Sequence, residues 1–107
     1  MTLIALITMP EDQARELART LVRERLAGSV NVLPGTFSVY RWNGDAAEDT
    51  EALMIVKTTQ ERYPALEERV RALHPYQIPE IVALPTARTL PAFAEWLYES
   101  VEVEGKS

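Results

Sequence analysis

The chain has 107 residues, 47% of them hydrophobic and 25% charged, and a net charge of −5, which is typical of a single soluble domain. It contains no cysteine, which excludes disulfides, thiolate metal ligands and cysteine nucleophiles. Its basic residues are interleaved with acidic ones, whereas a nucleic-acid partner requires a clustered basic face. No apolar run approaches the roughly 20 residues that cross a bilayer, and no signal peptide is recognisable. We therefore expect one domain over residues 1–107, in the cytoplasm, with neither a nucleic-acid nor a membrane partner.

A buried strand and an amphipathic helix are the first predicted elements. Residues 3–7 form a continuous apolar run, which favours a central strand. Thr8 and Glu11 fit a capping box, and Pro10 suits the first turn of the helix that follows. Gly28 stands where a C-terminal cap is expected. The apolar stripe of this helix contains Ala14, Leu17, Ala18, Leu21 and Val22.

The next segment predicts a β-hairpin. Residues 29–41 read as a long strand, in which Pro34-Gly35 indicates an edge strand with a bulge or bend. Asn43-Gly44 is a strong turn signal. A second strand is expected from about Glu48 to Thr58, so the tip of the hairpin should be somewhat loose.

The second half of the chain predicts helix, strand and helix. A helix is expected over residues 60–73, with an irregular first turn because of Pro64. A strand over 78–84 and a helix over 91–101 follow, and the polar tail 102–107 is expected to be frayed. The side chains expected to face the core from these two helices are Tyr63, Leu66, Val70, Leu73, Phe93, Trp96, Leu97 and Val101.

The order of these elements predicts an α+β fold, a ferredoxin-like βαββαβ sandwich with an added C-terminal helix. Right-handed crossovers place the first and third strands in the centre of the sheet and the second and fourth at its edges. The second strand would extend about 40 Å, at roughly 3.3 Å per residue. The first helix would cover only about 27 Å. The hairpin should therefore extend beyond its own helices.

The overhanging hairpin carries several large apolar side chains, namely Phe37, Val39, Tyr40 and Trp42. A long edge strand with exposed aromatic residues is an aggregation hazard unless another chain pairs with it. We therefore expect self-association. The alternative is that the C-terminal helix covers this surface within one chain.

His74 is the only histidine, and it precedes a stiff stretch that contains Pro75 and Pro79. It is a candidate metal ligand or proton carrier. The alternative is a C-terminal helix cap, since an imidazole there can bond the last carbonyls.

Three further clusters have both a functional and a structural interpretation. The acidic set near the hairpin tip offers oxygen ligands for a hard cation, or is a solvated tip. Lys57-Thr58-Thr59 precedes a helix and offers anion-binding donors, or caps that helix. Tyr40-Arg41-Trp42 suits stacking on a planar ligand, or fills an interface. The acidic set consists of Asp45, Glu48, Asp49 and Glu51.

Several of these segments, in this order, resemble the CutA divalent-cation-tolerance family. The resemblance implies a ferredoxin-like fold similar to PII signalling proteins, a homotrimer in which hairpin and edge strands pair between neighbours, and a link to copper and other divalent metals. The matching pieces are Ala27 to Asn31, Pro34-Gly35, Tyr40 to Gly44, Lys57 to Thr59, His74 to Tyr76, Ile78 to Ile81 and Leu84-Pro85.

The metal ligands discussed for this family are cysteine and histidine, and the sequence departs from that set. Ile7 and Ser29 stand where some members have cysteine, and Leu73 stands where some have a second histidine. Only His74 remains. Without sulfur ligands, copper(II) or zinc is favoured over copper(I).

The resemblance and the residues together predict a cytosolic homotrimer that binds a divalent cation, copper(II) or zinc, weakly at His74 in clefts between subunits. The alternative is a PII-like module that senses a small anionic metabolite without catalysis. A third reading, an enzyme with His74 and Glu80 as acid and base, lacks any supporting motif. The residues expected in the cleft are Tyr40, Trp42, Glu48, Lys57, Tyr76, Glu80 and Trp96.

Overall fold

A computed structural model describes residues 1–103, which form one four-stranded antiparallel sheet and three helices. The strand order is β2-β3-β1-β4, which confirms the α+β, ferredoxin-like fold with the first and third strands in the centre. The elements are β1 (Thr2–Met9), α1 (Glu11–Arg23), β2 (Ser29–Trp42), β3 (Asp45–Thr59), α2 (Tyr63–Leu73), β4 (Ile81–Pro85) and α3 (Pro91–Ser100).

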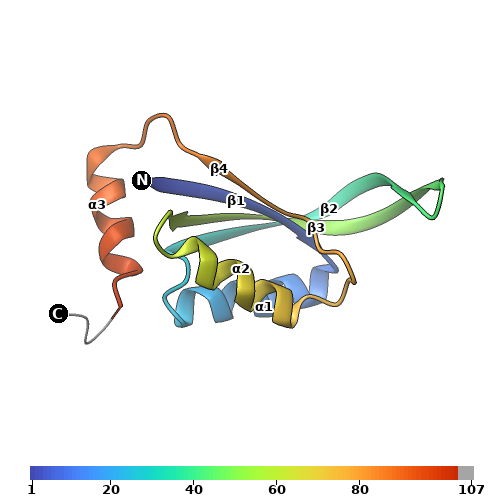
Figure 1. Cartoon of the computed structure of the whole chain (residues 1–107), viewed down its shortest axis with the longest axis horizontal. Helices are drawn as coiled ribbons and strands as arrows, with labels where there is room; N and C mark the ends of the chain where they lie inside the picture. The colour runs from blue at the N-terminus through green and yellow to red at the C-terminus, as the bar shows by residue number, and fades with distance from the viewer. Residues whose placement is uncertain (104–107) are drawn as a thin grey trace.

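Helices α1 and α2 lie side by side on one face of the sheet, and α3 lies at one end of it (Figure 1). Strand alternation sends one set of apolar side chains from β1 and β3 toward the two helices, where they are fully buried. The core contains Ala5, Ile7 and Met9 of β1, Ala52, Met54 and Val56 of β3, Leu17 and Leu21 of α1, and Leu66 and Val70 of α2.

The opposite face of the sheet is also apolar, and no described helix covers it (Figure 1). Its side chains come from the alternate positions of all four strands, as the pairing of Leu6 with Ile55 and Val82 shows. We call this surface the open sheet face. It contains Ile4, Leu6, Leu33, Leu53, Ile55, Val82 and Leu84.

The β2–β3 hairpin extends beyond α1 and α2, as predicted, and contributes to a long molecule of 49 × 27 × 22 Å (Figure 1). Asn43 and Gly44 both have positive φ, 51° and 83°, which suits a two-residue type I′ turn. The strands pair up to this turn, from Trp42 opposite Asp45, so the prediction of a loose tip was wrong. The predicted bulge is present between Leu33 and Thr36.

Two predictions about the ends of α1 were wrong. The N-cap is Pro10, without a side-chain cap, because Thr8 is still part of strand β1. The helix ends at Arg23, and Arg25 takes the left-handed conformation, with φ of 60°. Gly28 has another role: a Cβ there would lie 2.4 Å from Leu97 Cδ1, so its small size lets α3 approach closely.

Later boundaries also differ from the prediction. Residues 60–62 form the expected irregular turn, and α2 begins only at Tyr63. Strand β4 begins at Ile81 instead of Ile78, because residues 78–80 leave the sheet.

Only some of the side chains expected to face the core are buried. The inward direction predicted for Leu97 is correct, whereas Trp96 is 44% exposed. The expectation of a frayed tail falls partly on residues 104–107, outside the described residues. Val101 is buried as predicted, whereas Leu73, Phe93 and Val22 are exposed.

No helix within residues 1–103 is both long and apolar enough to span a bilayer.

Candidate functional site

A groove of about 910 Å³ lies between the outer half of the hairpin, including Trp42 beside the turn, and the segment that joins α2 to β4. We call it the hairpin groove. Strand alternation places Leu53 and Glu51 of β3 on the side of the open sheet face, so the groove continues that face beyond the end of β1. Four of the predicted cleft residues line it, namely Tyr40, Trp42, Tyr76 and Glu80.

The other three predicted cleft residues lie elsewhere. Glu48 pairs with Val39, on the opposite side of the hairpin from Tyr40. Lys57 lies farther along β3, and Trp96 lies on α3 close to Gly28. The structure therefore does not bring all seven residues together.

Glu51 is the groove residue that the sequence analysis did not single out from the acidic tip. It is only 4% exposed, and Tyr76 Oη donates a hydrogen bond of 2.7 Å to its Oε2. Burial, followed by this bond, raises the pKa of Tyr76 well above its usual range. The alternation of β3 puts Glu51 on the side of Leu53 and Ile55, but Asp49 has the same parity and is exposed, so alternation alone could not have singled out Glu51.

A second phenol–carboxylate pair lies farther along the hairpin, where Tyr40 Oη donates to Asp49 Oδ2. This bond is the largest cause that raises the pKa of Tyr40. The charges of Asp49 and Glu51 both act on the Tyr76 phenol, as does Tyr40 itself. The two pairs thus form one electrostatic cluster, in which both phenols are kept protonated.

His74 holds the groove wall in place through both of its ring nitrogens. Its Nε2 lies 2.7 Å from the carbonyl oxygen of Thr8, and the backbone N–H of Tyr76 donates to its Nδ1 at 3.1 Å. A carbonyl can only accept and an amide N–H can only donate, so the ring is the neutral tautomer with its proton on Nε2. The ring is 8% exposed and lies 4.9 Å from that of Tyr76. His74 is also the C-cap residue of α2, and its backbone N–H donates to the carbonyl oxygen of Val70 at 2.8 Å. Its ring bonds β1 and not the last carbonyls of α2.

This arrangement fits a metal at His74 poorly, because ligation needs a free nitrogen lone pair. The Nδ1 lone pair accepts from Tyr76, and Nε2 carries the proton. Within the described residues, no three or more His, Asp or Glu side chains lie close enough together to hold a metal ion. A metal at His74 would have to displace the contact that anchors the segment after it.

Lys57 lies on the strand parity of the open sheet face, next to Ile55 in that row. Its Nζ donates to Asn31 Oδ1 and, at 3.1 Å, to the carbonyl oxygen of Ile55. Burial lowers the pKa of this ammonium group. The cation therefore belongs to the sheet surface and does not take part in the groove.

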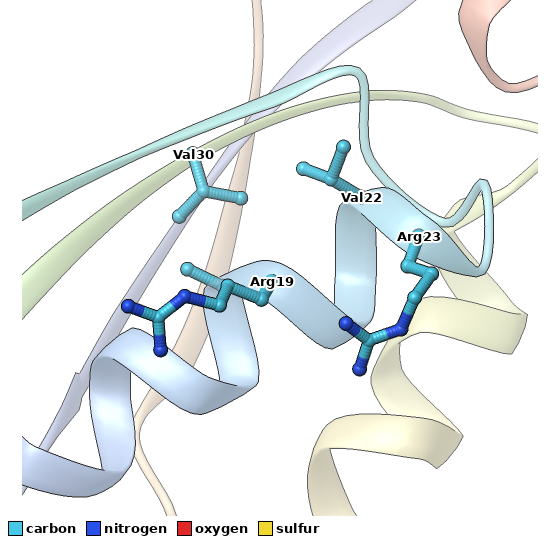
Figure 2. Close-up of a pocket in the computed structure, with 5 residues that line it drawn as sticks. Arg19, Val22, Arg23 and Val30 are labelled. Atoms are coloured by element: carbon cyan, nitrogen blue, oxygen red, sulfur yellow. The ribbon is translucent and has the colours of Figure 1, made fainter.

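A second, shallower hollow of about 430 Å³ lies between α1 and the start of β2 (Figure 2). Val22 and Val30 form its apolar part, beside the side chains of Arg19 and Arg23. Both guanidinium groups lie near Glu16, at 3.5 and 3.9 Å. None of the predicted site residues lines this hollow.

Comparison with known proteins identifies the family. Residues 3–100 match the family model described as CutA1 divalent ion tolerance protein. The chain is 53% identical over 98 residues to the divalent-cation tolerance protein CutA of Thermus thermophilus, with 91% of this chain and 95% of that protein covered. It is 41% identical over 99 residues to protein CutA of Mus musculus, with 92% of this chain covered but only 56% of the mouse protein.

Solved structures agree with the sequence matches. The Cut A1 structure from Thermus thermophilus has a TM-score of 0.92 at 51% identity and covers 95% of this chain and 100% of that chain. The periplasmic divalent cation tolerance protein CutA from Archaeoglobus fulgidus has a TM-score of 0.92 at 37% identity, with 95% and 100% covered. Because that relative is described as periplasmic, the cytoplasmic location of this chain stays a prediction. The chain belongs to the CutA1 divalent ion tolerance protein family.

Proposed function

We propose that this chain acts in divalent-cation tolerance as a homotrimer that binds a cation in clefts between subunits, with the hairpin groove as one wall of each cleft. The observation that carries the proposal is the buried carboxylate of Glu51, which lies in the groove and forms no ion pair with any described residue. A buried charge is costly unless a charge of opposite sign accompanies it.

Exposed apolar surface supports the assembly. Phe37 is 64% exposed on the hairpin, and the open sheet face lacks a cover within residues 1–103. Contiguous apolar patches of this kind mark interaction surfaces. The hairpin and the free edge of β4 are different surfaces, and a contact between different surfaces forms a ring when its rotation closes. The family resemblance implies three chains in that ring.

A divalent cation in the cleft would have carboxylate oxygens from Glu51 and Glu80 and would need further ligands from a neighbouring copy. Oxygen ligands of this number give weak binding of copper(II) or zinc, of about micromolar affinity or worse. The predicted site at His74 has less support, because both of its ring nitrogens are already hydrogen-bonded.

The alternative of an anionic metabolite has less support than a cation. Lys57, which was expected to meet the anion, lies outside the groove, and Glu51 and Glu80 line it. The descriptions of the matched family and relatives name no catalytic activity, in agreement with the prediction that the chain is not an enzyme.

Light scattering at micromolar concentration tests the assembly. We expect a mass of about three chains and a melting temperature that rises with protein concentration, because an obligate oligomer is stabilised by mass action. Trp42→Ala should weaken the assembly, since large aromatic residues dominate buried interfaces. Trp96→Phe, outside the groove, is the control. A stable, well-folded monomer, or two well-separated unfolding transitions, would contradict the proposal.

Calorimetry with copper(II) and zinc tests the cleft. We expect Glu51→Gln to weaken binding about tenfold or more, and His74→Ala to weaken it less. If binding disappears in His74→Ala, persists in Glu51→Gln and fades below about pH 6, the imidazole of His74 and not Glu51 is the metal ligand.

A further inference from the structure

The two phenols of the hairpin groove offer hydrogen-bond acceptors and not donors. A phenol has a single proton. Tyr40 donates its proton to Asp49, and Tyr76 donates its proton to Glu51. The phenol oxygens can therefore offer only lone pairs to a ligand. A ligand that complements this surface must itself bring N–H or O–H donors.

Glu51 adds a negative charge to these acceptors. Its Oε2 accepts from Tyr76, and no hydrogen bond from any described residue reaches its Oε1. Every fully buried side-chain polar atom in the described part of the chain has a partner, so Oε1 must be accessible from the groove. The carboxylate is thus buried among protein atoms on most sides and open toward the groove.

The rest of the lining combines large apolar side chains with polar ones such as Ser38 and Gln77. Tyr40, Trp42 and Tyr76 supply aromatic surface, which attracts cations, and Ile78 supplies aliphatic surface. Among the described lining residues only Arg41 is cationic, and its Nη1 lies 3.5 Å from the carbonyl oxygen of Gly44, at the hairpin turn. The volume of about 910 Å³ is far larger than a bare metal ion requires.

We propose that the hairpin groove binds an organic ammonium ligand with an aliphatic body. Its N–H groups donate to Glu51 Oε1 and to the phenol oxygens, and its methylene groups lie against Trp42 and Ile78. The inference rests on the proposed function, because it takes the groove as the ligand cleft. An alkylammonium group needs only a few acceptors and an apolar wall, all of which this chain supplies by itself.

A titration with 1,4-diaminobutane, followed by the fluorescence of Trp42 in a Trp96→Phe background, tests the inference. Ligand binding is measured by fluorescence and molecular mass by light scattering, on the same samples and at constant ionic strength. We expect saturable binding that Glu51→Gln weakens about tenfold, since the amide keeps an acceptor for Tyr76 but loses the charge. Succinate, an anion of similar length, should neither bind nor compete.

Glu48→Gln is the matched control, because it removes the same charge from the same strand on the other side of the hairpin. Its affinity for the diamine should stay within about twofold of wild type. Equal losses in Glu48→Gln and Glu51→Gln would mean general charge attraction and would overturn the inference.

Two other outcomes separate the inference from the proposed function. A trimer that binds copper(II) or zinc but not the diamine overturns the inference and leaves the proposed function standing. A monomer contradicts the proposed assembly, whereas Glu51-dependent diamine binding by that monomer still supports the inference.

Discussion

The two faces of the sheet carry similar residues but have different surroundings. On β3, Met54 and Val56 face α1 and α2 and are fully buried, while the residue between them, Ile55, belongs to the open sheet face. Leu84 of β4, on that same face, is 48% exposed. Continuous apolar runs are typical of strands buried on both sides. The comparison teaches that β1 and β3 carry two apolar faces, of which residues 1–103 cover only one.

The largest effects should come from mutating one residue on each face of the sheet in turn. Met54→Ala removes a fully buried side chain, so it should lower the free energy of unfolding by about 2–5 kcal/mol while the proposed oligomer keeps its composition. Ile55→Asp should instead dissociate the oligomer, because it places a charge on the open sheet face. Denaturation followed by circular dichroism, with light scattering, distinguishes the two results.

Ile55→Val is the control for the second substitution and should keep the oligomer. If Ile55→Asp lowers the free energy of unfolding as Met54→Ala does and leaves the mass unchanged, the two faces do not differ in the role proposed here.

A smaller effect is expected at the end of the sheet, where α3 docks. Gly28→Ala places a Cβ within 2.4 Å of Leu97 Cδ1 and 3.3 Å of Trp96 Cζ3. Leu97 is buried and has little room to move, so the substitution should cost about 1–3 kcal/mol through overpacking. Thermal melts of Gly28→Ala and of Gly28→Ala with Leu97→Ala measure it. The second change should reduce the cost of the first, and strictly additive losses would contradict this contact.

The pH dependence of folding stability tests the comparison at Lys57, which lies on the open sheet face. Burial lowers its folded-state pKa below its ordinary value of 10.5, so between these two values the unfolded state binds more protons and stability rises with pH. Below the lowered pKa the buried charge is a constant cost. Lys57→Met should therefore stabilise the protein at neutral pH by about 1 kcal/mol or less and abolish this alkaline rise. Melting temperatures from about pH 7 to pH 10 would be compared with those of Lys57→Arg, which stays charged.

The smallest effect is expected on the outer surface of the helices, far from the open sheet face. Arg69 donates two hydrogen bonds of 2.9 Å to Glu24, and this pairing is the main cause that lowers the pKa of Glu24 from 4.5. A lowered carboxyl pKa gives stability that is present above the ordinary value and lost as pH falls through the folded-state value.

Glu24→Gln should therefore melt slightly below wild type at neutral pH, and the difference should vanish on acidification through the pKa of Glu24. Both side chains are about two-fifths exposed, so added salt should shrink the difference as well. A difference that persists unchanged in acid would show that the pair does not depend on the charge of Glu24.

Much of the fold followed from patterns that act over short distances. The apolar run of residues 3–7, the Asn43-Gly44 turn and the Pro34-Gly35 bulge each depend on neighbouring residues, so the sequence predicts them well. Helix ends were harder. Thr8 satisfies a capping pattern, yet strand pairing with Leu53 keeps it in β1.

The site was predictable only in part, because it depends on contacts between distant residues. The role of His74 depends on the carbonyl of Thr8, 66 positions earlier in the chain, and the burial of Glu51 depends on Tyr76. Lys57 and Trp96 belong to matching family segments or to apolar patterns, which carry no information about which groove a side chain lines.

The bulge in β2 determines which side of the hairpin each later side chain of β2 faces. Val32 lies opposite Met54 on the helix side, whereas Thr36 lies opposite Glu51 on the open side, although both positions are even. One additional residue on β2 between these pairs inverts the alternation. Without it, Tyr40 would point to the other side of the hairpin and away from Asp49. A one-residue deletion at Pro34-Gly35 would thus keep Tyr40 and Trp42 in the chain and yet turn both side chains away from the groove.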